Sequence, residues 1–198
     1  NRILFQILEI REKIYRGEER IAFDKKHEPV FQNLYEAMFA KIKCETLIHQ
    51  HRENIRAGKG CSYNIENGVI TINEAIDNDL NMAFKDFFIR GQIAIDVTLD
   101  LINYIGYKVS FVFKNEKDFE KESKKFLEVN NTPLFRHFVD GMRNNRKNWY
   151  ELFNNIRNQI EHQGFKVPQI KYGLDENNTI TPIYFNYGNQ TVAEILDI

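Results

Sequence analysis

The sequence contains few cysteines and prolines, no long apolar run and no excess of charge of either sign. Two cysteines, Cys44 and Cys61, cannot build a disulfide framework in 198 residues, and neither lies in a cluster with metal-ligand spacing. We therefore expect a cytoplasmic protein without a bound metal or cofactor. No apolar stretch is long enough to span a bilayer, so we expect no membrane association. The formal net charge of -1 excludes a bulk attraction to nucleic acid, but it leaves room for a local basic patch.

Hydrophobic residues (42%) and aromatic residues (13%) are sufficient for a folded core. Their spacing predicts a mainly α fold, a helical bundle with two short β-hairpin additions. The expected helices cover residues 2–16, 28–57, 78–107, 114–130 and 134–162, and the expected hairpins cover residues 61–72 and 166–187. We expect one domain over residues 1–198, with a helical core at 78–164, N-terminal helices and a hairpin at 1–77, and a hairpin and tail at 166–198.

Several details follow from single residues. Pro29 suits the first turn of the second helix. Gly91 predicts a close helix crossing on the third helix, which is apolar on two faces and so should be central to the bundle, and Gly141 is a candidate break in the last helix. His49 and His51 point about 200° apart on a helix, so they cannot share a metal and are expected at the surface. The second helix should bury one apolar stripe, made of Phe31, Leu34, Met38, Ile42 and Leu47.

One short motif near the end of the last helix could carry chemistry. Residues 157–162 read Arg-Asn-Gln-Ile-Glu-His, which is R-N-x-x-x-H. An Arg-Asn pair at this spacing from a histidine is expected about 0.03 times by chance in such a composition. Arg20 and His27 form a looser match with a longer spacer, but they precede Pro29 in an expected loop, and we discount them.

The motif resembles the signature of the HEPN superfamily, whose all-helical domains occur in many prokaryotic toxins and RNA-cleaving defence proteins. In that signature an Arg is followed after four to six residues by a His, often with a polar residue directly after the Arg, the place that Asn158 fills here. The resemblance covers residues 78–164. It implies a metal-independent endoribonuclease in a toxin, defence or RNA-processing setting. It also implies a homodimer with two motifs across one groove, and an antitoxin protein as a further partner.

The residue types suit RNA cleavage. His162 can take or give a proton near neutral pH, and Arg157 can donate hydrogen bonds to charged phosphoryl oxygens. Asn158 could orient the imidazole or donate to phosphate. These residues should project away from the core stripe of their helix. The ordinary alternative is a solvated polar face on which Arg157 pairs with Glu161. The predicted core stripe consists of Trp149, Leu152, Phe153, Ile156 and Ile160.

Residues 136–166 carry six Lys or Arg against three acids, a local charge of +3. Arg143, Arg146 and Lys147 are therefore candidate RNA-binding residues. Trp149 and Tyr150 could stack on bases, although Trp149 suits packing better. Two other functions stay open: a non-catalytic HEPN-like module that binds RNA, a nucleotide or a protein, and a purely structural interaction domain.

Overall fold

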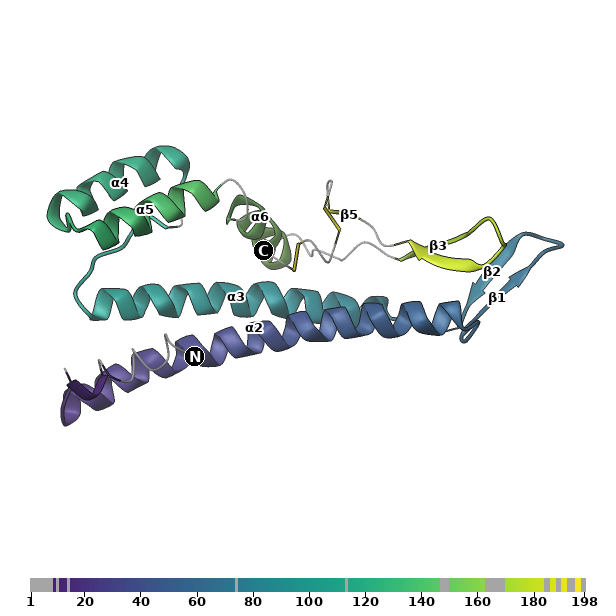
Figure 1. Ribbon diagram of the computed structural model, residues 1–198, viewed down its shortest axis with the longest axis horizontal. Helices are drawn as coiled ribbons and strands as arrows, with labels where there is room; N and C mark the ends of the chain where they lie inside the picture. Colours follow the sequence, from purple (N-terminus) through teal and green to yellow (C-terminus); the bar gives the residue numbers. More distant parts are fainter. Residues whose placement is uncertain are drawn as a thin grey trace. The chain divides into compact units, whose positions relative to one another are not determined.

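The computed structural model describes residues 9, 11–13, 15–73, 75–112, 114–146, 150–162, 170–183, 186–187, 190–191 and 195–196. The fold is mainly α, as predicted. Its helices are α2 (Glu18–Arg56), α3 (Asp77–Tyr104), α4 (Glu116–Val129), α5 (Pro133–Asn145) and α6 (Glu151–His162) (Figure 1). Its strands are β1 (Cys61–Asn64), β2 (Val69–Ile72), β3 (Lys171–Leu174), β4 (Ile180–Ile183), β5 (Asn186–Tyr187) and β6 (Gln190–Thr191). Within the described residues, no helix has the length and apolar character needed to cross a membrane.

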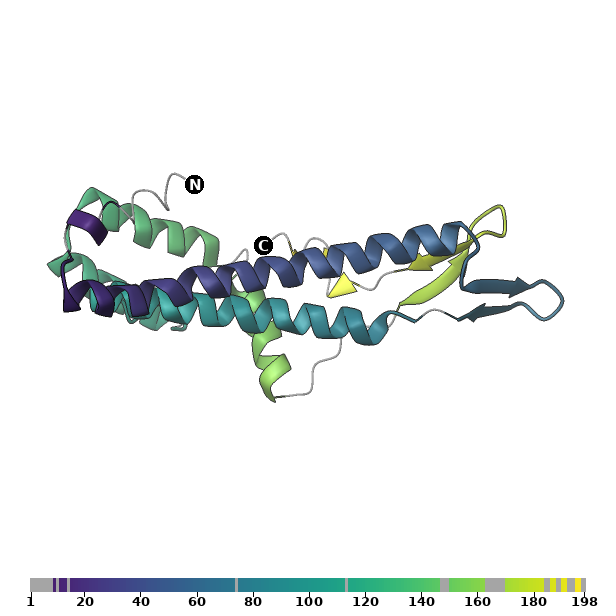
Figure 2. The ribbon, with the colours of Figure 1, turned by 90° about the horizontal axis from the view of Figure 1, so that it is seen from below.

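The chain forms two compact units. One comprises Asn1–Tyr35 with Arg90–Asn154, and the other comprises Glu36–Ile89 with Asn155–Ile198. The long helices α2 and α3 each contribute to both units, and within each unit a stretch of α2 runs beside a stretch of α3 (Figures 1 and 2).

Helix α2 begins at Glu18, so the prediction of a helix that starts at Glu28 or Pro29 is wrong. Pro29 lies inside the helix, where it lacks the N–H of a regular helical hydrogen bond and costs about 3 kcal/mol. Packing offsets this cost, because Phe23 and Val30 on either side of the proline are buried on one face. The side chain of Asn33 donates to the Pro29 carbonyl at 2.8 Å.

The buried face of α2 also differs from the predicted stripe. Leu34, Met38 and Ile42 are exposed. Most of the buried side chains are smaller or more polar, and all repeat at the same helical spacing: Phe23, His27, Val30, Ala37, Ala40, Cys44, His51 and Ile55. Two apolar stripes thus share this helix, and the fold buries the one whose small side chains allow close packing.

The prediction that His51 lies at the surface is wrong. His51 is fully buried, and its Nε2 lies 2.8 Å from the Tyr172 hydroxyl on β3. His49, in contrast, is exposed as predicted.

Both predicted hairpins are present as antiparallel pairs. Strands β1 and β2 pair from Cys61↔Ile72 to Asn64↔Val69, and Gly68 adopts φ +66° in the turn between them. Strands β3 and β4 pair likewise, β4 also contacts β1, and β5 and β6 add a third short pair.

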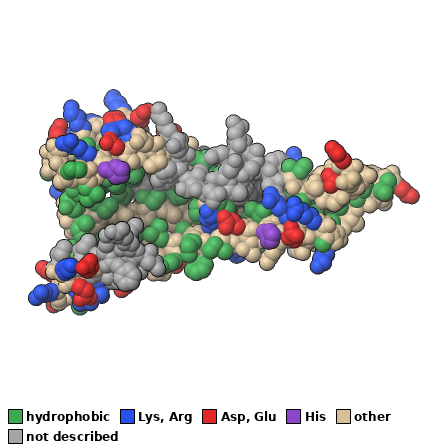
Figure 3. Space-filling view, in the orientation of Figure 1, with side chains coloured by type: hydrophobic (Ala, Val, Ile, Leu, Met, Phe, Trp, Pro, Cys, Tyr) green, Lys and Arg blue, Asp and Glu red, His purple; other side chains and the backbone are tan. Residues whose placement is uncertain are grey.

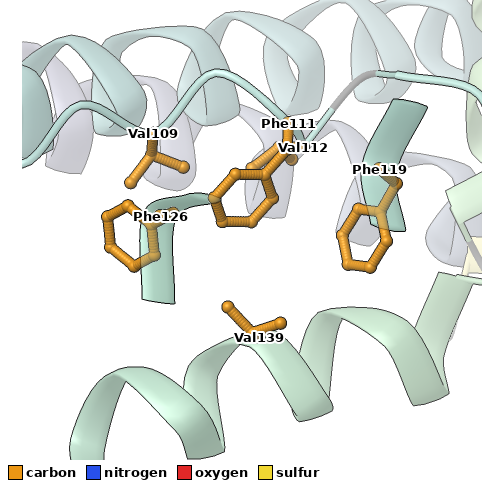
Figure 4. Packing of buried hydrophobic residues seen from close by; sticks show 6 residues of the cluster. All are labelled: Val109, Phe111, Val112, Phe119, Phe126 and Val139. Atoms are coloured by element: carbon orange, nitrogen blue, oxygen red, sulfur yellow. The ribbon is translucent and has the colours of Figure 1, made fainter. Parts of the chain in front are cut away.

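The predicted helix at residues 114–130 is α4, and its anchors Phe119 and Phe126 are buried as expected. Asn115 caps it by accepting a hydrogen bond from the Asp118 backbone N–H at 2.9 Å. Together with α5 and the segment after α3 it forms an aromatic core (Figure 4). Phe111 is fully buried there, with its ring centroid 5.6 Å from that of Phe119 and 5.4 Å from that of Phe126.

The last predicted helix corresponds to two helices, α5 and α6, and Gly141 lies within α5 rather than between them. Arg146, which follows α5, is buried; its guanidinium donates to the Lys114 carbonyl and lies over the rings of Phe119 and Tyr150.

Candidate active site

Helix α6 carries the R-N-x-x-x-H motif. Phe153 and Ile156 are buried, whereas Leu152 and Ile160 are half-buried. Trp149, the fifth residue of the predicted stripe, lies outside the described residues. The helix begins with an acidic residue, Glu151, and ends with a residue that can be cationic, His162, and both placements suit the helix dipole.

Arg157 is held by two neighbours on its own helix. Its Nη2 lies 2.9 Å from Glu161 Oε2, and its Nη1 donates to Asn158 Oδ1 at 2.9 Å. The side chain is 28% exposed, and its buried Nε has no hydrogen-bond partner among the described residues. Each terminal nitrogen of a guanidinium carries two N–H groups, so each has one N–H that these contacts with described residues do not use.

His162 is the most accessible member of the motif. Its side chain is 72% exposed, and its Nε2 lies 3.8 Å from Glu161 Oε2. The same carboxylate oxygen thus faces both the guanidinium and the imidazole. The sequence predicted Glu161 as a helix partner of Arg157, which is correct, but its approach to His162 was missed because adjacent helical residues usually diverge.

Asn158 pairs with Arg157, and no hydrogen bond joins it to His162 within the described chain. Its amide oxygen is used as an acceptor, which leaves its Nδ2 as a donor. Of the two roles predicted for Asn158, this arrangement suits donation to phosphate better than orientation of the imidazole.

The candidate RNA-binding residue Arg143 is already paired. Its Nε and Nη2 lie 2.7 Å and 3.0 Å from the Glu120 carboxylate, and its Nη1 lies 2.6 Å from Asp140. The hydrogen bonds from Arg143 lower the pKa of the Glu120 carboxyl, so the carboxylate stays charged. The positive charge of Arg143 is therefore balanced within the protein.

Two other residues that were predicted to contact RNA are also not available at the surface. Arg146 is buried in the contacts described above, and Tyr150 is buried, so its ring is not available to stack on a base. Lys147 and Lys166 lie outside the described residues. Of the four arginines described in this segment, Arg143 and Arg157 pair with acids, whereas Arg136 and Arg146 donate to the neutral oxygens of Asn131 and Lys114.

The looser match, Arg20 and His27, lies on α2 and not in a loop. Arg20 pairs with Glu12 at 2.6 Å, and His27 is buried between the rings of Phe23 and Phe31. Burial lowers the pKa of His27 and keeps its ring neutral. A buried neutral imidazole cannot reach a substrate, so this pair is structural.

No protein-family model, curated protein or solved structure matches the chain. Assignment of a protein class therefore depends on the chemistry of α6.

Proposed function

We propose that this protein is a HEPN-type, metal-independent endoribonuclease that acts as a homodimer in a toxin, defence or RNA-processing setting. The observation that carries the proposal is the geometry at the end of α6, where an exposed imidazole and a half-buried guanidinium flank one carboxylate. In a toxin setting, an antitoxin protein is the expected further partner.

The reaction is an internal phosphoryl transfer. His162 takes the proton of a ribose 2′-hydroxyl, and the oxygen attacks the adjacent phosphorus. The O2′–P bond forms as the P–O5′ bond breaks, which leaves a 2′,3′-cyclic phosphate on one product. The departing 5′-oxygen takes a proton and becomes a hydroxyl.

Arg157 and Asn158 stabilise the charge that develops on the non-bridging phosphoryl oxygens. The remaining N–H groups of the guanidinium and the Asn158 amide supply donors for this charge. Glu161 fixes the guanidinium and also supports the positive charge that His162 acquires when it takes the proton.

The reaction needs one group that accepts a proton and one that donates a proton, whereas each motif offers a single imidazole. A two-fold dimer supplies the second from His162 of the partner subunit, across a shared groove. This is why we propose the homodimer as the active form.

The test is cleavage of single-stranded RNA by the purified full chain in the presence of EDTA, with analysis of the product ends. We expect cyclic phosphate and 5′-hydroxyl ends. His162→Ala and Arg157→Ala should each lower the rate by about 100-fold or more. Because His162 is exposed, its replacement should leave the melting temperature almost unchanged.

Two matched controls accompany these variants. His137 is an exposed histidine on α5, and Arg56 pairs with Glu53 on its own helix much as Arg157 pairs with Glu161. Neither His137→Ala nor Arg56→Ala should change the rate. A wild-type protein that binds RNA with a steep salt dependence but never cuts it would contradict the enzyme and favour the binding module.

A further inference from the structure

A cavity of about 580 Å³ lies between the end of α3 and the start of α5, within one of the two compact units. We call this cavity the α3–α5 groove. Apolar side chains from both segments form its walls: Ile102, Tyr107, Val109, Leu134, Phe135 and Phe138. Hydrophobic side chains gather on this part of the surface, between α5 and the end of α3 (Figure 3). The volume lies within the range of small-molecule sites, which is about 300–1,000 Å³.

The walls of the groove are fixed by the aromatic core beneath them. Val109 belongs to that core, and Phe135 and Phe138 pack against it. The rings of Tyr107 and Phe135, one from each wall, lie with their centroids 4.6 Å apart. The groove therefore exists before a ligand binds, so binding costs little reorganisation.

The lining is suited to an alkyl chain. None of the described residues that line the groove is charged, and two of them, Thr132 and Tyr107, carry a hydroxyl. An extended peptide would bring one backbone N–H and one C=O with almost every residue, and two hydroxyls cannot pair them all. An alkyl chain has no such groups, and its burial is favourable without hydrogen bonds.

The end of the groove at the start of α5 is suited to an anion. Arg136 is exposed, and its Nε donates to Asn131 Oδ1 at 2.7 Å, which holds the guanidinium beside the residue that precedes Thr132. No acid in the described part of the chain pairs with Arg136. The two segments that form the groove, residues 102–109 and 132–138, contain no Asp or Glu. The N-terminus of α5 adds the positive end of a helix dipole.

We propose that the α3–α5 groove binds a free single-chain carboxylate, such as a fatty acid. The alkyl chain lies between the two walls, and the terminal nitrogens of Arg136 donate hydrogen bonds to the carboxylate. No residue of α6 takes part, so this site and the endoribonuclease can fail separately.

The experiment is isothermal titration calorimetry of the full chain with octanoate, decanoate and dodecanoate. Each added CH₂ should tighten binding about fourfold, or about 15-fold for two carbons, until the groove is filled. Decyltrimethylammonium carries a chain of the same length as decanol and the opposite charge to decanoate. It should bind at least about tenfold more weakly than decanoate, because its head group meets Arg136.

One pair of variants tests the walls. Leu134, which is 71% exposed, lies in the first turn of α5, where an acid suits the helix dipole. Leu134→Asp should therefore fold, but it removes an apolar wall residue and sets a negative charge beside the anion, so decanoate should bind about tenfold more weakly or worse. Ile65→Asp is the matched control, because Ile65 is an exposed apolar residue in the turn between β1 and β2. It should leave the affinity unchanged, and circular dichroism checks that each variant is folded.

A second pair tests the head group. Arg136→Gln should weaken decanoate binding by about fivefold, the upper end for an exposed ion pair, and should narrow its advantage over decyltrimethylammonium. Lys108→Gln removes the same charge from a segment that forms the groove, but Lys108 lines a different cavity, with Glu122 and Lys125. It should have little effect.

Three results would overturn the proposal. The first is an affinity that does not rise with chain length, and the second is an equal loss in Leu134→Asp and Ile65→Asp. The third is binding to phosphatidylglycerol vesicles without binding of free decanoate, which would assign the exposed apolar side chains to a membrane surface instead.

Discussion

Helix α6 packs against α3 at Gly91, where the absence of a side chain leaves room for the Phe153 ring. A Cβ atom built there would lie 3.1 Å from Cζ and 3.2 Å from Cε2 of Phe153, closer than ordinary van der Waals contact. Phe153 is buried, so its ring has little room to yield. Gly91→Leu gains about 0.8 kcal/mol of helix propensity, but overpacking costs about 1–3 kcal/mol before the remaining carbons are placed.

We therefore expect Gly91→Leu to lower the free energy of unfolding by about 2 kcal/mol, which corresponds to a melting temperature lower by about 4–8 °C. Gly141 supplies the control, since it also lies inside a helix but has no atom within 4 Å of an added Cβ. Gly141→Leu should stabilise the protein by about 0.8 kcal/mol.

Urea unfolding followed by circular dichroism measures both effects. In a Phe153→Ala background the space beside Gly91 is open, so Gly91→Leu should there cost little or nothing. An equal effect of leucine at Gly91 and Gly141, or a full cost at Gly91 after Phe153 is truncated, would refute this account. If the proposed function holds, Gly91→Leu should also slow RNA cleavage, because Phe153 belongs to the helix that carries the motif.

Three further outcomes are expected. Phe111→Ala should lower the free energy of unfolding by about 3–5 kcal/mol in urea titrations, because the ring is fully buried among other aromatic rings. Burial raises the pKa of Cys44 to about 12, so a thiol reagent at mildly alkaline pH should modify Cys61 first and Cys44 only on unfolding. Hydrogen bonds from Arg143 lower the pKa of Glu120 in the folded state; the pair should stabilise the fold above the unfolded pKa of about 4.3, and this contribution should disappear as the pH falls through the folded value. Glu120→Gln should remove that part of the acid dependence, by less than about 1 kcal/mol because the pair is half exposed.

Local signals in the sequence were sufficient to predict α3, α4 and both hairpins. Helix α4 shows why: Phe119 and Phe126 are seven residues apart, which puts both on one face, and a capping asparagine precedes the helix. The turn at Gly68 requires positive φ, which glycine adopts without strain. In each case the decisive interaction spans only a few residues.

The prediction for α2 was wrong because two stripes of its residues repeat with helical spacing. Hydrophobicity alone favours Leu34, Met38 and Ile42, whereas close packing favours Ala37 and Cys44. Which stripe is buried depends on the neighbouring helix, and that information is not local. The burial of His51 has the same origin, since its partner Tyr172 lies 121 residues further along the chain.

The candidate site also combines local interactions within one helix with interactions between segments far apart in the sequence. Arg157, Asn158 and His162 lie close together because one helix carries them, so their spacing alone was enough to predict their grouping. The basic surface expected around them depended on arginines whose partners come from other segments, such as Glu120 and the Lys114 carbonyl. Arg143 is neutralised by acids and Arg146 is buried, so neither is placed to hold an RNA along its length. If the proposed function holds, cleavage depends on a few donors placed close to one phosphate. In the proposed homodimer, the second copy would supply those donors by bringing another α6 to the same phosphate.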